Sequence, residues 1–184
     1  LLELNLSKAM IGAEGAKALG QALVETRSLR VLQLSWCKLR ADGVRHVAEG
    51  LRRNATLVKL SLARNSLGDK GVFELVSGGL EACKSLRELD LRHNAIGPEG
   101  AKRLTAMLEK KNFTLSTLDF AGNKLNAAEE SALVGLASSQ RKKPTAKFKA
   151  PFPSQPPAEA SGGEGGDEEN KGVANNLFDA HVPV

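Results

Sequence analysis

Five copies of a leucine pattern cover the first three quarters of the 184-residue chain. Each copy begins Leu-x-x-Leu-x-Leu, with Phe120 replacing the last leucine of the fifth, and the copies start at residues 1, 29, 57, 86 and 115. Alternation over the last three positions predicts a short strand whose leucines point to one side. Because the pattern recurs every 28 or 29 residues, it predicts units that bury their apolar faces against copies of themselves.

A tight turn is expected after each strand. In the last three units the turn carries an asparagine, and the second unit has Cys37 in its place. A side-chain amide there pairs with backbone groups that an inward-facing turn leaves open. The sequence therefore predicts a structural role for Asn65, Asn94 and Asn123, and a buried rather than reactive Cys37.

A helix is expected to follow each turn. Apolar residues recur there at helical spacing, as in Ala16, Leu19, Ala22 and Leu23, or in Ala101, Leu104, Ala106 and Leu108. Four units share a glycine near the helix start, where the missing side chain permits close approach to a neighbour or to the turn: Gly15, Gly43, Gly71 and Gly100. Arg52 and Arg53 end the second helix, and stabilisation of its C-terminus accounts for them.

The pattern stops near Ala137, and residues 138–184 are rich in Pro, Gly, Ser and charge. Low hydrophobicity predicts a disordered or partner-bound tail. Two apolar islands within it, Phe148 with Phe152 and Leu177 with Phe178, are candidate docking segments. The predicted domains are thus a solenoid over 1–137, with repeats 1–28, 29–56, 57–85, 86–114 and 115–137, and a tail over 138–184.

The leucine, asparagine and glycine positions resemble the leucine-rich repeat family, in particular its ribonuclease-inhibitor-like subtype. The family pattern is matched well at 57–67 and 86–96, and at 29–39 with Cys37. Departures are Ala9 in the first unit, and Phe120 and Glu129 in the fifth. The resemblance implies an α/β fold, a right-handed solenoid with parallel strands on its concave face and helices on its convex face.

Side chains between the strand leucines are expected on the concave face. One row reads Asn5, Gln33, Ser61, Asp90 and Asp119, and another reads Glu3, Val31, Lys59, Glu88 and Thr117; neither has one sign of charge. Lys8, Trp36, Arg64 and His93 share a repeat position just beyond the strands and should lie side by side. Stacking of Arg64 on Trp36 either covers the turn or forms a hot spot for a partner. Arg87 and Arg92 are predicted to extend that patch.

Charge and chemistry exclude several classes of function. Lys and Arg outnumber Asp and Glu by 20 to 15 in residues 1–137 but form no run there, so we do not expect nucleic acid to bind. The three histidines and two cysteines show no catalytic or metal-ligand spacing, so no catalytic residue, metal or cofactor is expected. No signal peptide or membrane span is visible in the pattern.

The sequence therefore predicts a non-enzymatic protein-interaction module, a structural or scaffold subunit of a larger intracellular assembly. Its protein partners would bind the concave face and the tail, in a reducing cytoplasmic setting that includes a cilium or axoneme. Since the chain opens inside a repeat, we expect it to be the closing segment of a longer solenoid. The alternatives are a regulatory repeat region resembling NOD-like receptors or ribonuclease inhibitor, and a small-GTPase-activating protein.

Overall fold

Strands and helices alternate through the computed structural model, which describes residues 1–109 and 114–139. The strands are β1 (Glu3–Asn5), β2 (Val31–Gln33), β3 (Lys59–Ser61), β4 (Glu88–Asp90) and β5 (Thr117–Asp119). The helices are α1 (Gly12–Glu25), α2 (Arg40–Arg53), α3 (Gly68–Leu75), α4 (Pro98–Leu108) and α5 (Ala127–Ser139), and α3 continues as a π-helical turn, η1 (Val76–Leu80). Each predicted unit thus holds one strand and one helix.

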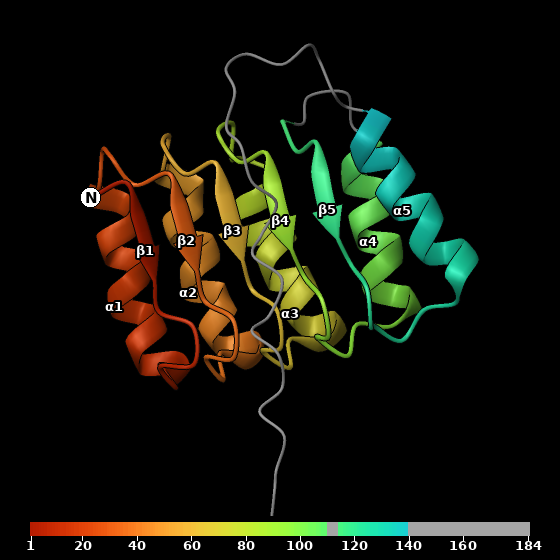
Figure 1. Cartoon of the computed structure of the whole chain (residues 1–184), viewed down its shortest axis with the longest axis horizontal. Helices are drawn as coiled ribbons and strands as arrows, with labels where there is room; N and C mark the ends of the chain where they lie inside the picture. The colour runs from red at the N-terminus through yellow and green to blue at the C-terminus, as the bar shows by residue number, and fades with distance from the viewer. Residues whose placement is uncertain (110–113, 140–184) are drawn as a thin grey trace, which may run out of the picture. The chain divides into compact units, whose positions relative to one another are not determined.

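The five strands form one parallel sheet in chain order, and the helices form a second layer (Figure 1). Register follows the leucine repeat, because Leu4, Leu32, Leu60, Leu89 and Leu118 pair as neighbours along the sheet. Both predicted rows of side chains between the leucines are confirmed by the same register. Adjacent strands lie about 4.8 Å apart and packed helices about 8–10 Å apart, so a stack of this kind bends toward its strands.

The core lies between the sheet and the helices. The central leucines of β2, β3 and β4 are fully buried, as are Leu51, Leu75 and Leu104 from the helices. Burying one such side chain contributes about 1.5–3 kcal/mol. The predicted helix stripes are confirmed at Ala16, Leu23, Ala101, Leu104 and Leu108 and wrong at Ala22 and Ala106, which are exposed; Met107 is buried beside Leu108.

The asparagines tie each repeat to the one before it. The Nδ2 of Asn65 donates to the carbonyls of Leu34 (2.7 Å) and Leu62 (2.9 Å), while its Oδ1 accepts the N–H groups of Cys37 (2.9 Å) and Leu39 (3.3 Å). Asn94 and Asn123 repeat this arrangement one and two units further on. These bonds satisfy backbone groups that the turns leave without sheet or helix partners. The predicted structural role of the asparagines is confirmed.

Glycine allows the helices to approach one another closely on the side away from the sheet. A Cβ at Gly79 would lie 2.4 Å from the carbonyl oxygen of Ala48, and one at Gly50 would lie 2.5 Å from that of Gly20. At the predicted position near the helix start, a Cβ on Gly71 would lie 2.7 Å from the Cβ of Leu67 in the turn beneath. Close contact between helix backbones therefore requires glycine at Gly50 and Gly79, and close packing on the turn requires it at Gly71.

The third helix accommodates one extra residue. The third repeat has 29 residues where the second has 28, and the equivalent glycines near the helix start, Gly43 and Gly71, lie at the same distance from their repeat starts. The added residue therefore falls within the helix, where η1 widens one turn. A π turn absorbs a single insertion without shifting the buried positions on either side.

The fifth unit differs from the others in its helix start. Glu129, which replaces the glycine, accepts the N–H of Asn126 (3.1 Å), and Asn126 accepts the N–H of Glu129 in return (2.9 Å). This reciprocal capping box stabilises the start of α5. Phe120 is fully buried in place of the expected leucine. Helix α5 reaches Ser139, two residues beyond the predicted end of the solenoid at 137. The tail that follows lies outside the described residues.

Candidate protein-interaction site

A row of side chains follows the C-terminal ends of the strands: Lys8, Trp36, Arg64 and His93, which we call the strand-end row. The N–H of Trp36 donates to the carbonyl of Ala63 (3.0 Å), that of Arg64 to Arg92 (2.9 Å) and that of His93 to Ala121 (3.0 Å). Because each residue is bonded to the chain beside its counterpart in the next repeat, the four are neighbours in space. The predicted side-by-side arrangement is confirmed.

Trp36 and Arg64 form the centre of this row. The Arg64 guanidinium lies 4.9 Å from the centroid of the Trp36 ring, a cation–π distance. The indole is nonetheless 48% exposed. The Nε of Arg64 is buried and has no hydrogen-bond partner among residues 1–109 and 114–139, so this nitrogen is held by stacking. The pair therefore presents a large, oriented aromatic surface to solvent.

The backbone at the strand-end row is left-handed. The φ angles of Lys8, Trp36, Arg64 and His93 are 66°, 60°, 57° and 52°, and Gly122 holds the equivalent place in the fifth repeat with φ 73°. A residue in this region costs about 1–3 kcal/mol unless it is glycine. Four repeats thus carry bulky side chains at a position where glycine would cost less. The residues two positions later, Met10, Lys38, Ser66 and Ala95, also have positive φ angles, between 50° and 58°, so left-handed backbone is a property of the turn in these repeats.

His93 ends the row beside the fifth repeat. A Cβ at Gly122 would lie 2.3 Å from the Nδ1 of His93, so the imidazole covers the backbone there. His93 is exposed to solvent. The structure therefore places His93 in the row predicted from the sequence, one repeat away from Arg64.

Arg92 takes a different role from the predicted one. Its Nη2 lies 2.9 Å from Asp90 Oδ2 and its Nε lies 3.1 Å from Asp119 Oδ2. A hydrogen bond to Asp90 raises the pKa of Arg92 above its ordinary value, opposed by burial and helped by the charges of Asp90 and Asp119. The side chain is thus neutralised within a network that also includes Ser61, whose Oγ donates to Asp90 (2.9 Å). No signal in the sequence marks this network, because two of its members, Ser61 and Asp119, come from the repeats on either side.

The prediction that Arg87 extends the patch is wrong. Arg87 precedes β4, and its N–H donates to the carbonyl of Val58, which precedes β3. Arg87 therefore lies at the N-terminal ends of the strands, whereas Trp36 and Arg64 lie beyond the C-terminal ends. The candidate tail residues Phe148, Phe152, Leu177 and Phe178 fall outside the described residues.

Metal and thiol chemistry find little support in the described part of the chain. Within residues 1–109 and 114–139 no group of three or more His, Cys, Asp or Glu side chains is arranged to hold a metal ion. His46 contacts only Glu49 as an ion-pair partner there, at 3.4 Å. Cys37 and Cys83 are both free and buried. Cys37 lies 3.1 Å from the carbonyl of Leu6, the position that the Nδ2 groups of the asparagines take in later repeats.

We expect Cys37 to react slowly with a thiol reagent in the folded chain. Burial raises the pKa of the Cys37 thiol, outweighing the backbone hydrogen bonds that lower it. A raised pKa keeps the thiol of the folded chain protonated. Its contribution to the free energy of unfolding is therefore fully present below the pKa of the unfolded thiol, about 8.5, and is lost as the pH rises through the pKa of the folded thiol. Aromatic disulfide reagent at pH 8 should titrate Cys37 only after denaturant is added; rapid native reaction in a Cys83→Ser chain would contradict burial.

No helix within the described ranges is long and apolar enough to cross a membrane.

Comparison with known proteins agrees with the repeat geometry. The sequence model of the Leucine Rich repeat family matches residues 1–20, 26–48, 53–76 and 82–104. Ribonuclease inhibitor of Sus scrofa is 36% identical over 126 residues, which are 68% of this chain and 27% of the inhibitor. A NACHT, LRR and PYD domains-containing protein of Homo sapiens, number 13, is 33% identical over 118 residues, 64% of this chain and 11% of that protein.

A solved structure supports the fold. Actin-binding site 2 of leiomodin-1 aligns with a TM-score of 0.62 at 20% identity, covering 75% of this chain and 79% of that one. The chain spans about a quarter of ribonuclease inhibitor and a smaller share of the NACHT, LRR and PYD domains-containing protein. Taken with the strand register and the turn asparagines, these matches show that the chain belongs to the leucine-rich repeat family, with repeats of the ribonuclease-inhibitor type.

Proposed function

We propose that this chain is a non-enzymatic module that binds a protein partner through the strand-end row, with Trp36 and Arg64 as the main anchors. The observation that carries the proposal is a half-exposed tryptophan held in place by a stacked arginine. Trp and Arg are enriched among the few residues that dominate interface energies. Preorganised side chains also lose little rotamer freedom when a partner binds.

The left-handed backbone supports the same proposal. Trp36 adopts φ 60°, where a side chain is tolerated only at a cost. Folding alone would favour glycine there, as Gly122 shows in the fifth repeat. Tryptophan at this position presents an exposed ring from a backbone that the turn fixes, which supports a role for the ring in binding.

We expect Trp36→Ala to weaken partner binding by roughly 30-fold or more, the loss typical of a hot spot of about 2 kcal/mol. The partner is first identified by crosslinking the tagged chain in cells, and its affinity is then measured by titration against each variant. Phe73→Ala is the matched control, because Phe73 is 52% exposed and lies 5.0 Å from Arg103 in a similar aromatic–arginine pair on α3 and α4. Equal affinity of wild type and Trp36→Ala for every partner would refute the proposal.

The wider proposal is that the module works inside a larger assembly in the cytoplasm. Two buried free cysteines are consistent with a reducing compartment. Repeat solenoids present extended surfaces to partners and are frequent components of complexes. Size-exclusion chromatography of the tagged chain from native cell extract should show it in a high-molecular-mass complex, and elution at the mass of the isolated chain would contradict this part of the proposal.

Ribonuclease inhibition is a second candidate function, favoured by the 36% identity to ribonuclease inhibitor. A direct assay separates the two candidates: purified chain is added to a pancreatic-type ribonuclease and RNA cleavage is followed. Inhibition that Trp36→Ala abolishes would identify a ribonuclease as the partner. If the rate of RNA cleavage is unchanged, ribonuclease inhibition is ruled out and the proposal of an interaction module for another protein stands.

A further inference from the structure

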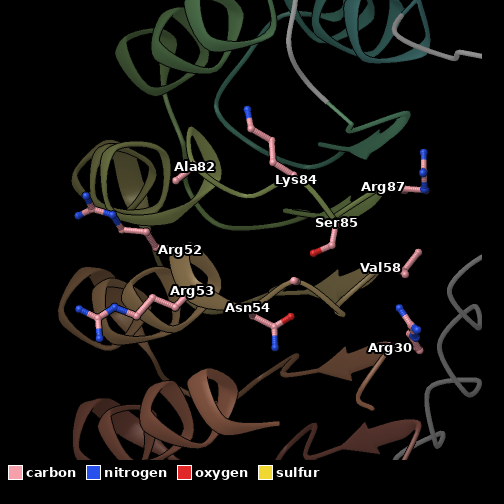
Figure 2. Close-up of a pocket in the computed structure, with 10 residues that line it drawn as sticks. Arg30, Arg52, Arg53, Asn54, Val58, Ala82, Lys84, Ser85 and Arg87 are labelled. Carbon is pink, nitrogen blue, oxygen red and sulfur yellow. The ribbon is translucent and has the colours of Figure 1, made fainter. Parts of the chain in front are cut away.

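A groove whose charged side chains are all positive lies at the N-terminal ends of the strands. The strand-end row lies at the opposite, C-terminal ends. Arg30 precedes β2 and Arg87 precedes β4, so the two hold the same repeat position on either side of Val58. Arg52 and Arg53 at the end of α2 and Lys84 before β4 also line the groove, but in Figure 2 the side chains of Arg52 and Arg53 point away from Arg30 and Arg87. The cavity measures about 430 Å³, within the ~300–1,000 Å³ range of ligand pockets.

The lining contains five basic side chains and no acidic one; the other lining residues are Asn54, Ala55, Val58, Ala82 and Ser85. None of the ion pairs in residues 1–109 and 114–139 includes an arginine of the groove. All four arginines are exposed. A second cavity between α1, α2 and α3 also borders Arg52 and Arg53, but Glu49 and Glu74 line it as well. Uncompensated charge is therefore concentrated at the strand side, around Arg30 and Arg87.

At the floor of the groove, the polar groups of Asn54 are hydrogen-bonded within the protein. Asn54 is 4% exposed, its Nδ2 donates to Leu23 O (2.8 Å), and its Oδ1 accepts the N–H groups of Thr56 and Leu57. One nitrogen of Arg30, Nη1, donates to the carbonyl of Thr56 (3.1 Å). This bond orients the guanidinium and leaves its other N–H groups available to a ligand. The loops thus hold the arginines apart on a fixed base.

Gathering like charges without a counter-charge destabilises a folded chain. The C-terminus of α2 offsets this cost for Arg52 and Arg53, since the helix dipole stabilises cations there. No such dipole acts on Arg30 or Arg87, which precede strands. Their placement on one groove is consequently explained best by an anionic ligand, because guanidinium groups bind carboxylates and phosphates in a bidentate way.

We propose that this groove binds an acidic peptide segment of a protein partner. Arg30 and Arg87 are two strand spacings apart, about 10 Å, and an extended peptide covers that length in about three residues. Two carboxylates separated by that length pair with the two arginines while the chain between them crosses Val58. No aromatic residue lines the groove, so the stacking that single-stranded nucleic acids use is missing. The site is independent of Trp36, which lies beyond the C-terminal ends of the strands.

The test uses the full 184-residue chain and a fluorescent peptide of about 12 residues with Glu at every third position and Gly between, with a Gln version as the uncharged probe. Arg30→Gln combined with Arg87→Gln should weaken binding of the Glu peptide about tenfold, since guanidinium–carboxylate hydrogen bonds are charge-assisted and salt screens them in part at an exposed site. The control is Lys17→Gln combined with Lys102→Gln, which removes the same net charge from exposed sites on α1 and α4. This control should change affinity less than twofold.

Three outcomes would overturn the proposal: no binding of the Glu peptide at low salt, equal weakening in the two double variants, or equal affinity for the Gln peptide. A single-stranded oligonucleotide of matched charge is titrated in parallel. Tighter binding of the oligonucleotide, with the same loss in the groove variant, would assign the site to nucleic acid instead. Matching thermal unfolding curves for both double variants exclude loss of fold as the cause of weaker binding.

Discussion

Asn65→Ala is expected to lower the free energy of unfolding by about 3–5 kcal/mol. The side chain is 1% exposed and bonds to two N–H groups of the second repeat, at Cys37 and Leu39, and to the carbonyls of Leu34 and Leu62. Alanine leaves these buried groups unpaired, and each unpaired group costs about 1–3 kcal/mol, reduced by relaxation and entry of water. Urea unfolding followed by circular dichroism measures the change.

Two variants make this prediction specific. Asn5→Ala removes an exposed asparagine whose Oδ1 accepts one N–H, from Ser7, and should change stability by less than about 0.5–1 kcal/mol. Asn65→Cys should fall between wild type and alanine, because Cys37 already fills this position in the second repeat and contacts the preceding carbonyl of Leu6. If Asn65→Ala and Asn5→Ala had equal effects, the inter-repeat bonds would contribute nothing to stability.

Hydrogen exchange should show where the stability is lost. Repeats of a solenoid are coupled mainly to their neighbours, and Asn65 joins the second repeat to the third. Amides of β2 and of the turn after it should therefore exchange faster in Asn65→Ala than amides of β4. Uniform acceleration through all strands would indicate that the chain unfolds as one unit instead.

Gly79→Ala should destabilise the chain by about 1–3 kcal/mol, the range of an overpacked core. The added Cβ would lie 2.4 Å from the oxygen of Ala48, and within 2.9 Å of its carbonyl carbon and Cα. These are backbone atoms of α2, so the contact is relieved only by moving one helix away from the other. Thermal unfolding gives the shift directly.

Gly135→Ala is the matched control for Gly79→Ala. Both substitutions add one methyl group to a helical glycine, but a Cβ at Gly135 meets nothing within 4 Å. Alanine is favoured over glycine in an exposed helix by about 0.8–1 kcal/mol, so this variant should be stabilised. Destabilisation by both variants to the same extent would show that helix contact is not the cause.

The repeat explains why so much of this fold can be predicted from the sequence. Once the 28- to 29-residue period is recognised, the strand register, the row from Asn5 to Asp119 and the neighbours Trp36 and Arg64 all follow from position within the repeat. Stacked units convert equal places in the sequence into adjacent places in space. Periodicity was less exact for the helices, where Ala22 and Ala106 are exposed although they are apolar.

Contacts between residues that hold different positions within their repeats could not be predicted in this way. Arg87 is predicted to extend the Trp36 patch because it lies on the next strand segment, but it precedes β4 whereas Trp36 follows β2, so the length of a strand separates them. Arg92 was assigned there too, and it binds Asp90 and Asp119 instead. The basic groove combines residues from a strand start, a helix end and a loop, and no single repeat position marks it.

By itself, then, the sequence determined the family, the number and order of repeats, and the side chains of the strand-end row, because a short period specifies local structure and nearest neighbours together. Only the tertiary structure decided which charges are neutralised and which are not. Those outcomes depend on distances of a few ångströms between side chains from different elements, such as Arg92 to Asp119 at 3.1 Å and Arg30 to the carbonyl of Thr56 at the same distance. Electrostatic pairing depends steeply on such separations, whereas the repeat pattern records only which residues share a position.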